Sequence, residues 1–215
     1  MAKSKQKKSS SSSKTKFVAP AWFTNSTIHV AVIALLAIGL YLNTLGHKYA
    51  LDDSIVITDN DFTKKGVAGI GDIMRYDTFR GFFKVEGKDK LVSGGRYRPF
   101  TLVMFATGIS LWGETPMINH LINILLYAGI GVMLYWWLMA LLGNRKSYGY
   151  GWFIALATAL LFVAHPVHTE CVANIKGRDE IVALLGSIIA AYFICLLYTS
   201  PSPRDATLSR MPSSA

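Results

Sequence analysis

The sequence predicts an all-α polytopic membrane protein with about four transmembrane helices and a long extracytoplasmic first loop that contains an interfacial helix. Of its 215 residues, 52% are hydrophobic and only 16% are charged, and the mean hydropathy is +0.35. Soluble proteins contain about 25% charged residues, so the deficit of charge points to lipid as the solvent. The apolar residues also gather in runs long enough to cross a bilayer. An ordinary soluble domain and a wholly disordered chain are both excluded.

The formal net charge of +9 comes largely from the first residues of the chain. Six of the 22 basic residues lie in positions 1–16, which contain no acid, and without them the charge is +3. A nucleic-acid-binding surface would need basic side chains along a folded face, so no nucleic-acid partner is expected. Residues 3–16 are mostly Lys and Ser and cannot form a core. We therefore expect residues 1–27 to be a disordered basic cytoplasmic tail.

Residues 28–45 form the first apolar run, close to the roughly 20 residues that a helix needs to span a bilayer. The lysine-rich flank places the N-terminus in the cytoplasm, and the absence of a small-residue cleavage pattern indicates a signal anchor. The polar segment 46–98, with eight of the 13 acids, is then extracytoplasmic. Such a long connection is either a functional loop or one with short helices on the membrane surface.

The remaining apolar runs are assigned by parity. Residues 99–112 begin with proline but number only 14, a length typical of an interfacial helix. With this run in the interface, residues 117–142 return the chain to the cytoplasm, and the Arg145 and Lys146 loop obeys the positive-inside rule. The third and fourth spans follow at residues 148–164 and 181–197. The polar segments 46–98 and 165–180 then share the outer face.

The last residues change in character. From about residue 196 the chain is rich in Ser, Pro and Arg. It resembles translated sequencing-adapter sequence, so we expect residues 196–215 to be a non-native tail; a genuine disordered tail is the alternative. The membrane module is therefore predicted to cover residues 28–195.

Asp52 and Asp53 are the first candidates for chemistry, because they follow the outer end of the first span. Adjacent carboxylates repel, which raises the pKa of one of them and prepares a general acid or base. The alternative is an ordinary solvated acidic pair. Arg96 and Arg98 precede the interfacial run and are suited to bidentate binding of a phosphate. Arginines at membrane edges are, however, more often anchors whose side chains reach toward water.

A second group of candidates follows the third span. His165, His168 and Glu170 are suited to binding a divalent metal, accepting a proton or donating to a phosphate. The histidines are three residues apart and lack a third ligand, which disfavours the metal, and the two cysteines show no zinc-ligand spacing. Arg178 is a cation at a helix start, where the helix dipole disfavours it, so we expect an anionic ligand or a carboxylate beside it.

Two polar residues interrupt the second apolar run. His120 and Asn123 are one helical turn apart. Polar groups inside a membrane are candidates for function, although hydrogen bonding between helices is the commoner explanation.

Four segments together resemble a known family. YALDDSIVITDNDFTKKG, RYRPF, NHLINILLYA and LFVAHPVHTECVANIKGRDEIVALL are similar, in order and spacing, to the N-terminal membrane region of the transmembrane and tetratricopeptide repeat-containing proteins. These resemble GT-C type glycosyltransferases of the protein O-mannosyltransferase kind. The resemblance covers about residues 28–195. The family carries further spans and repeats of about 34 residues, which this sequence lacks. We therefore expect the chain to be a fragment that is inactive alone.

The resemblance implies a function. The donor would be a polyprenyl or dolichyl phosphate sugar, and the acceptor a protein Ser or Thr hydroxyl on the extracytoplasmic side. Asp52 and Asp53 would supply the catalytic carboxylate, while Arg96, Arg98 or Arg178 would steady the leaving phosphate. No cofactor is required, although a divalent metal stays a minor alternative. The competing hypothesis is a non-catalytic membrane anchor or scaffold. The compact loops favour a bacterial plasma membrane over the endoplasmic reticulum.

Overall fold

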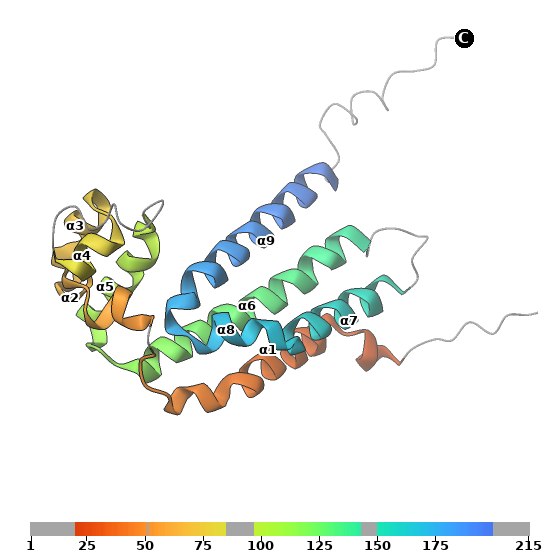
Figure 1. Ribbon diagram of the computed structural model, residues 1–215. Helices are drawn as coiled ribbons and strands as arrows, with labels where there is room; N and C mark the ends of the chain where they lie inside the picture. The colour runs from red at the N-terminus through yellow and green to blue at the C-terminus, as the bar shows by residue number, and fades with distance from the viewer. Residues whose placement is uncertain (1–19, 51, 85–96, 143–149, 200–215) are drawn as a thin grey trace, which may run out of the picture.

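The computed structural model describes residues 20–50, 52–84, 97–142 and 150–199, and every regular element within these ranges is helical (Figure 1). Four long helices form a bundle: α1 (Ser26–Tyr41), α6 (Pro116–Leu142), α7 (Gly151–Ala164) and α9 (Arg178–Thr199). The prediction of an all-α polytopic membrane protein is confirmed. The described ranges leave out residues 1–19, Arg96, Arg145, Lys146 and residues 200–215, and with them most of the two predicted tails.

Three segments of the described chain are long and apolar enough to cross a bilayer: Ser26–Gly46, Pro116–Leu142 and Ile175–Tyr198. A fourth span arises if α7 is joined to the helical segment Pro166–Ala173, from which it is bent by 48°. The bend has a local cause. His165 is extended (φ −73°, ψ 127°) because it precedes Pro166, and proline disfavours helical backbone in the residue before it. The predicted third span therefore corresponds to a bent pair of helices and not to one straight helix.

Helix α6 lies at the centre of the bundle and packs against α1, α7 and α9. The three helices α1, α6 and α7 approach closely at Gly131. A Cβ atom at this position would lie 2.6 Å from Val163 Cγ2 and 2.9 Å from Ile33 Cγ2, so only glycine permits the contact. Ala155 and Ala159 are also fully buried on α7. Small residues of this kind let helix backbones pack closely in lipid.

Ordered structure begins earlier than the predicted boundary at residue 28. A 3-10 helix, η1 (Ala21–Thr24), precedes α1, and the Asn25 side chain accepts a hydrogen bond from the Thr27 amide to cap α1. Asparagine at an N-cap sets the start of a helix independently of hydrophobicity. At the other end, α9 continues to Thr199, beyond the predicted fourth span.

Five short elements and α5 (Pro99–Trp112) follow η2 (Leu42–Gly46) and lie beside the bundle at the end where α6 and α9 begin (Figure 1). We call residues 54–84 and 97–112 the outer-loop subdomain. Its short elements are η3 (Ser54–Thr58), α2 (Asp61–Lys64), η4 (Gly66–Gly69), α3 (Ile70–Arg75) and α4 (Thr78–Phe83). The predicted interfacial helix coincides with α5. It is too short to span and packs mainly on η4, α2 and α3.

The connection from α7 to α9 completes the described fold. It consists of η6 (Pro166–His168), α8 (Thr169–Ala173) and η7 (Ile175–Gly177). Ile175 is fully buried against Val56, Ile57 and Phe105 of the outer-loop subdomain. This apolar contact brings the two polar segments of the sequence together at one end of the bundle.

Candidate functional site

Asp53 joins the two polar segments through backbone hydrogen bonds. Its Oδ1 accepts from the Lys176 amide at 2.8 Å, and its Oδ2 accepts from the Ala50 amide at 2.8 Å. The side chain is completely buried. A buried carboxylate is tolerated when it accepts such bonds. The diacid and the segment before α9 therefore meet at one face, as the sequence predicted.

Asp52 lies differently from its neighbour. The residue is exposed, and its Oδ2 lies 2.7 Å from Lys176 Nζ. Lys176 therefore contacts both aspartates, through its backbone amide and through its ammonium group. Of the adjacent pair, Asp52 faces solvent and Asp53 faces the protein interior.

A polar cavity of about 210 Å³ opens beside Asp52. Arg98 at its edge forms an ion pair with Asp179, and the Cys171 thiol donates to Glu180 Oε2 at 2.8 Å. The cavity thus brings together Asp52, Arg98 and Glu170, which were separate candidates in the sequence. Its full lining comes from the diacid loop, from the start of α5 and from the chain between α8 and α9: Asp52, Arg98, Glu170, Cys171, Asn174, Lys176, Gly177, Asp179 and Glu180.

An apolar groove of about 420 Å³ adjoins this cavity, between the first turns of α5 and α9. The groove shares Arg98, Asp179 and Glu180 with the cavity, and its other walls are mostly apolar: Pro99, Phe100, Thr101, Val182 and Ala183. Phe100 is 64% exposed. The charged cavity therefore continues into a surface suited to a hydrocarbon chain.

Arg178 does not line the cavity. It is 1% exposed, and its guanidinium donates to Asn123 Oδ1 at 2.8 Å and to the carbonyl and side-chain oxygens of Asn119. It also stacks over the Phe105 ring. Asn119 Nδ2 in turn donates to the hydroxyl of Tyr49, whose pKa is raised by burial. Neutral oxygens accept the hydrogen bonds of this cation, and the Asp53 carboxylate adds a favourable charge interaction, so a carboxylate lies near Arg178 as expected. Arg178 links α9, α6 and α5.

The two predicted histidines also lie outside the cavity lining. His165 is exposed, and its Nδ1 accepts from the Val167 amide as the cap of η6. The ring of His168 packs on Phe162, with the ring centroids 4.3 Å apart. Of the three predicted residues after the third span, only Glu170 lines the cavity with Asp52. In the described ranges, no group of three or more His, Cys, Asp or Glu residues is arranged to hold a metal ion.

The polar residues of α6 divide into two kinds. Asn123 is fully hydrogen-bonded, since its Nδ2 also donates to the Asn174 carbonyl at 3.1 Å. His120 is 1% exposed, and neither of its ring nitrogens has a hydrogen-bond partner among the described residues. Its ring lies against that of His47, with centroids 6.2 Å apart. Hydrogen bonding between segments therefore explains Asn123.

Sequence reasoning did not select Lys176 or Asp179 as site residues. Both lie in the stretch IKGRDE, and both are paired with residues far away in the chain. No local pattern carries that information. Asn119, which accepts from Arg178, was missed for the same reason.

Comparison with known proteins gives relatives from animals. The chain is 31% identical over 151 residues to "Protein O-mannosyl-transferase TMTC1" of Homo sapiens, and the match covers 70% of this chain and 16% of the relative. It is 33% identical over 158 residues to "Protein O-mannosyl-transferase TMTC2" of Mus musculus, with coverage of 72% and 17%. "Protein O-mannosyl-transferase Tmtc1" of Drosophila melanogaster is 30% identical over 162 residues, with coverage of 75% and 17%.

The chain thus spans about a sixth of the length of these relatives. No family model and no solved structure matches it. The animal relatives give no support to a bacterial plasma membrane. The similarity extends over more than two thirds of this chain, and the described ranges contain three helices long and apolar enough to cross a membrane, or four if the bent pair after α6 is one span. The chain belongs to the transmembrane and tetratricopeptide repeat-containing family.

Proposed function

We propose that this chain is part of a membrane glycosyltransferase that transfers a sugar from a polyprenyl or dolichyl phosphate to a protein hydroxyl. The observation that carries the proposal is the continuity of the Asp52 cavity with the groove between α5 and α9. A lipid-linked sugar needs a polar space for its phosphate and sugar and an adjacent apolar surface for its chain. The relatives named as O-mannosyl-transferases support the same class of reaction.

In the proposed reaction Asp52 is the general base. Its exposed carboxylate accepts the proton of the acceptor Ser or Thr hydroxyl while the oxygen forms a bond to the anomeric carbon. The bond between that carbon and the lipid phosphate oxygen breaks, and the phosphate leaves with the electron pair. A lipid phosphate is a competent leaving group, so the proposal includes no cofactor.

Arg98 is the proposed phosphate-binding residue among the described candidates. It is half-exposed and lies where the cavity and the groove meet. Its guanidinium suits a phosphate because it donates two parallel hydrogen bonds. In the described state it is paired with Asp179, so donor binding would exchange a carboxylate for a phosphate. Lys176, which pairs with Asp52, adds a second positive charge near the leaving group.

Asp53 and Arg178 are proposed as positioning residues. Asp53 holds the Lys176 backbone against the diacid loop, and Arg178 holds α9 against α6. Neither has access to the cavity in the described state, because both are buried. His165 and His168 stay as candidates for binding the lipid phosphate or another part of the substrate. Glu170 remains a substrate-binding candidate within the cavity.

We infer that the cavity opens on the extracytoplasmic or lumenal side and that the N-terminus is cytoplasmic. The lysine-rich N-terminal segment supports this orientation through the positive-inside rule. The contact between Asp53 and Lys176 supports a common compartment for both polar segments, whichever side it is.

The competing function is a non-catalytic anchor. The pair between Asp52 and Lys176 favours it, because an ion pair that links two segments has a structural use without any chemistry. The two functions separate in the full-length parent protein. Asp52→Asn should abolish mannosylation of the acceptor, measured by mass spectrometry of its glycoforms. Asp59→Asn is the matched control, since Asp59 is exposed in the same loop outside the cavity. Unchanged glycoforms in Asp52→Asn and in Asp53→Asn would remove the enzymatic function.

A further inference from the structure

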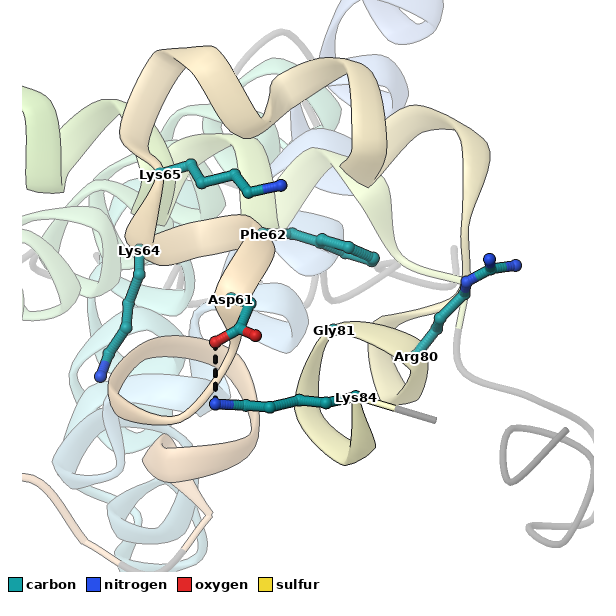
Figure 2. A pocket seen from close by; sticks show the side chains of 7 residues that line it. All are labelled: Asp61, Phe62, Lys64, Lys65, Arg80, Gly81 and Lys84. Atoms are coloured by element: carbon teal, nitrogen blue, oxygen red, sulfur yellow. Dashed lines mark ion pairs between the residues drawn. The ribbon is translucent and has the colours of Figure 1, made fainter. Parts of the chain in front are cut away.

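A larger hollow, of about 550 Å³, lies in the outer-loop subdomain between α2 and α4. We call it the basic pocket. It is lined by four basic residues, one acid, one aromatic ring and one glycine: Lys64, Lys65, Arg80, Lys84, Asp61, Phe62 and Gly81. Figure 2 shows the Phe62 ring in the middle, with the Lys65 side chain on one side of it and the pair of Lys84 and Asp61 on the other.

The walls of this pocket are held rigidly by Asn60, which is completely buried. Its Nδ2 donates to the Ile55 and Thr78 carbonyls at 3.0 Å each, and its Oδ1 accepts from the Phe62 amide at 3.1 Å. Gly81 lets α4 approach α2, because a Cβ atom there would collide with Asn60 Oδ1 and lie 2.8 Å from the Phe62 ring. The pocket is therefore preformed.

The pocket has an excess of positive charge. Lys84 Nζ lies 2.9 Å from Asp61, and Lys65 Nζ lies 2.8 Å from Asp72 outside the lining, but all four side chains are at least one-third exposed. Exposed pairs of this kind contribute little, so an incoming anion can replace the carboxylates. Lys64 has no ion pair with any residue of the described ranges. In Figure 2 it extends to one side of the pocket, and its flexible stem allows it to turn inward.

Lys84 adds an independent observation. It is the single non-glycine residue with a left-handed backbone among those described, with φ 59° at the end of α4. Glycine is the favoured residue at this cap because it has no Cβ penalty. A lysine there accepts a conformational cost and places an ammonium group at the pocket.

The surroundings indicate what the anion is. The same subdomain contains α5, which is apolar but too short to span and exposes Phe100 and Leu111. Such a helix lies at the level of the lipid headgroups. A basic pocket in the same subdomain as such a helix is suited to the phosphate group of a lipid headgroup, to which lysine ammonium groups donate charge-assisted hydrogen bonds.

We propose that the basic pocket binds the phosphate of an anionic phospholipid headgroup and so fixes the outer-loop subdomain on the membrane surface. Lys65 and Lys84 donate to the phosphate oxygens, and Lys64 adds its charge. This site is separate from the Asp52 cavity and does not depend on sugar transfer. The two hollows have no lining residue in common.

The test titrates the purified full chain with dioctanoyl phosphatidylglycerol and measures the dissociation constant by native mass spectrometry. Lys65→Gln/Lys84→Gln should weaken binding about tenfold or more, because it removes charge-assisted hydrogen bonds. Lys48→Gln/Arg75→Gln is the matched control, since both residues are exposed outside the pocket and the loss of charge is the same. Equal affinities in the two double variants would overturn the proposal.

Two further arms define the ligand and exclude misfolding. Dioctanoyl phosphatidylcholine should bind more weakly than phosphatidylglycerol, and inorganic phosphate should not compete at equal concentration. Competition by inorganic phosphate at equal concentration would show that the pocket binds free phosphate and not a lipid headgroup, and would overturn the proposal. Lys84→Gly removes the ammonium and relaxes the backbone, so it should weaken lipid binding without lowering the melting temperature. Undiminished lipid binding in Lys84→Gly would also count against the proposal.

Discussion

Lys176 donates its backbone amide to Asp53 at 2.8 Å while its ammonium group lies 2.7 Å from Asp52. Lys176, in the short segment before α9, therefore contacts both members of an acidic pair. Asp53 lies 123 positions earlier in the chain and Asp52 lies 124 positions earlier. The two contacts differ in kind. The first is part-buried and uses only the backbone of Lys176, whereas the second is solvent-accessible and uses its side chain. This difference lets substitutions separate the structural contribution of the pair from its proposed chemical one.

Asp53→Asn should destabilise the protein. An amide offers one acceptor oxygen in place of two, so its NH₂ group would face one of the two backbone amides that now donate to Asp53. The unpaired buried donor costs about 1–3 kcal/mol. The melting temperature of the purified chain in detergent measures this loss. Asp59→Asn should leave the melting temperature unchanged, and an equal change in both variants would contradict the assignment.

Lys176→Gln tests the exposed half of the same contact. The backbone amide still donates to Asp53, and the lost ion pair with a half-exposed carboxylate is worth about 0–1 kcal/mol. We expect nearly unchanged stability but slower mannosylation by the full-length parent, because a positive charge near the leaving phosphate is removed. A large loss of stability with normal glycoforms would make Lys176 purely structural.

Gly177→Ala should displace η7. A Cβ atom at this position would overlap the Cys171 carbonyl oxygen and lie 2.7 Å from its Cα, so the backbone that carries the Lys176 amide must shift. The expected result is a lower melting temperature together with reduced transfer in the parent protein. Gly186→Ala is the control on the following helix, where a Cβ atom meets nothing within 4 Å. An alanine tolerated at position 177 would show that η7 and α8 do not pack this closely.

Arg178→Met should be strongly destabilising, since it leaves the oxygens of Asn119 and Asn123 without their donor. Each unsatisfied buried group costs about 1–3 kcal/mol. Adding Asn123→Leu to Arg178→Met should cost less than the sum of the two single changes, because the two side chains belong to one network. Thermal unfolding of the four proteins gives the coupling, and additive changes would contradict the network.

Arg98→Gln should raise the KM for the lipid-linked donor in the parent protein and leave the melting temperature unchanged. Arg98 is half-exposed, and the groove and the cavity meet at its side chain. Arg75→Gln provides a control from the same subdomain, because Arg75 is exposed and lines neither hollow. A lower kcat with unchanged KM would place Arg98 in the chemical step instead of in donor binding.

The membrane-spanning helices could be predicted from the sequence because they depend on local hydrophobicity. Residues 117–142 correspond to α6 within one residue, and residues 99–112 correspond to α5. Pro99 and Gly113 mark the ends of α5 in the sequence as well as in the structure. The start of α1 was placed late because the Asn25 cap depends on a single side chain and not on an apolar run.

The candidate site was predicted only in part, because its geometry arises from contacts between distant segments. Asp52 and Glu170 share a cavity, but His168 turns away and packs on Phe162. Arg178 resembles an anion-binding residue in the sequence, yet the asparagines of α6 enclose it. Charge type and position along a helix do not reveal whether a side chain faces solvent or the helix beside it.

The central claim is that the diacid loop and the segment between α8 and α9 form one site in one compartment, opposite the lysine-rich N-terminal segment. Labelling with a membrane-impermeant maleimide tests it in intact and permeabilised microsomes, whose outer surface is cytoplasmic, with Cys171→Ser and Cys195→Ser as the background. Asp52→Cys and Glu170→Cys should both be labelled only after permeabilisation, whereas Lys14→Cys should be labelled in intact microsomes. Asp52→Cys and Glu170→Cys labelled from opposite sides of the membrane would contradict the account.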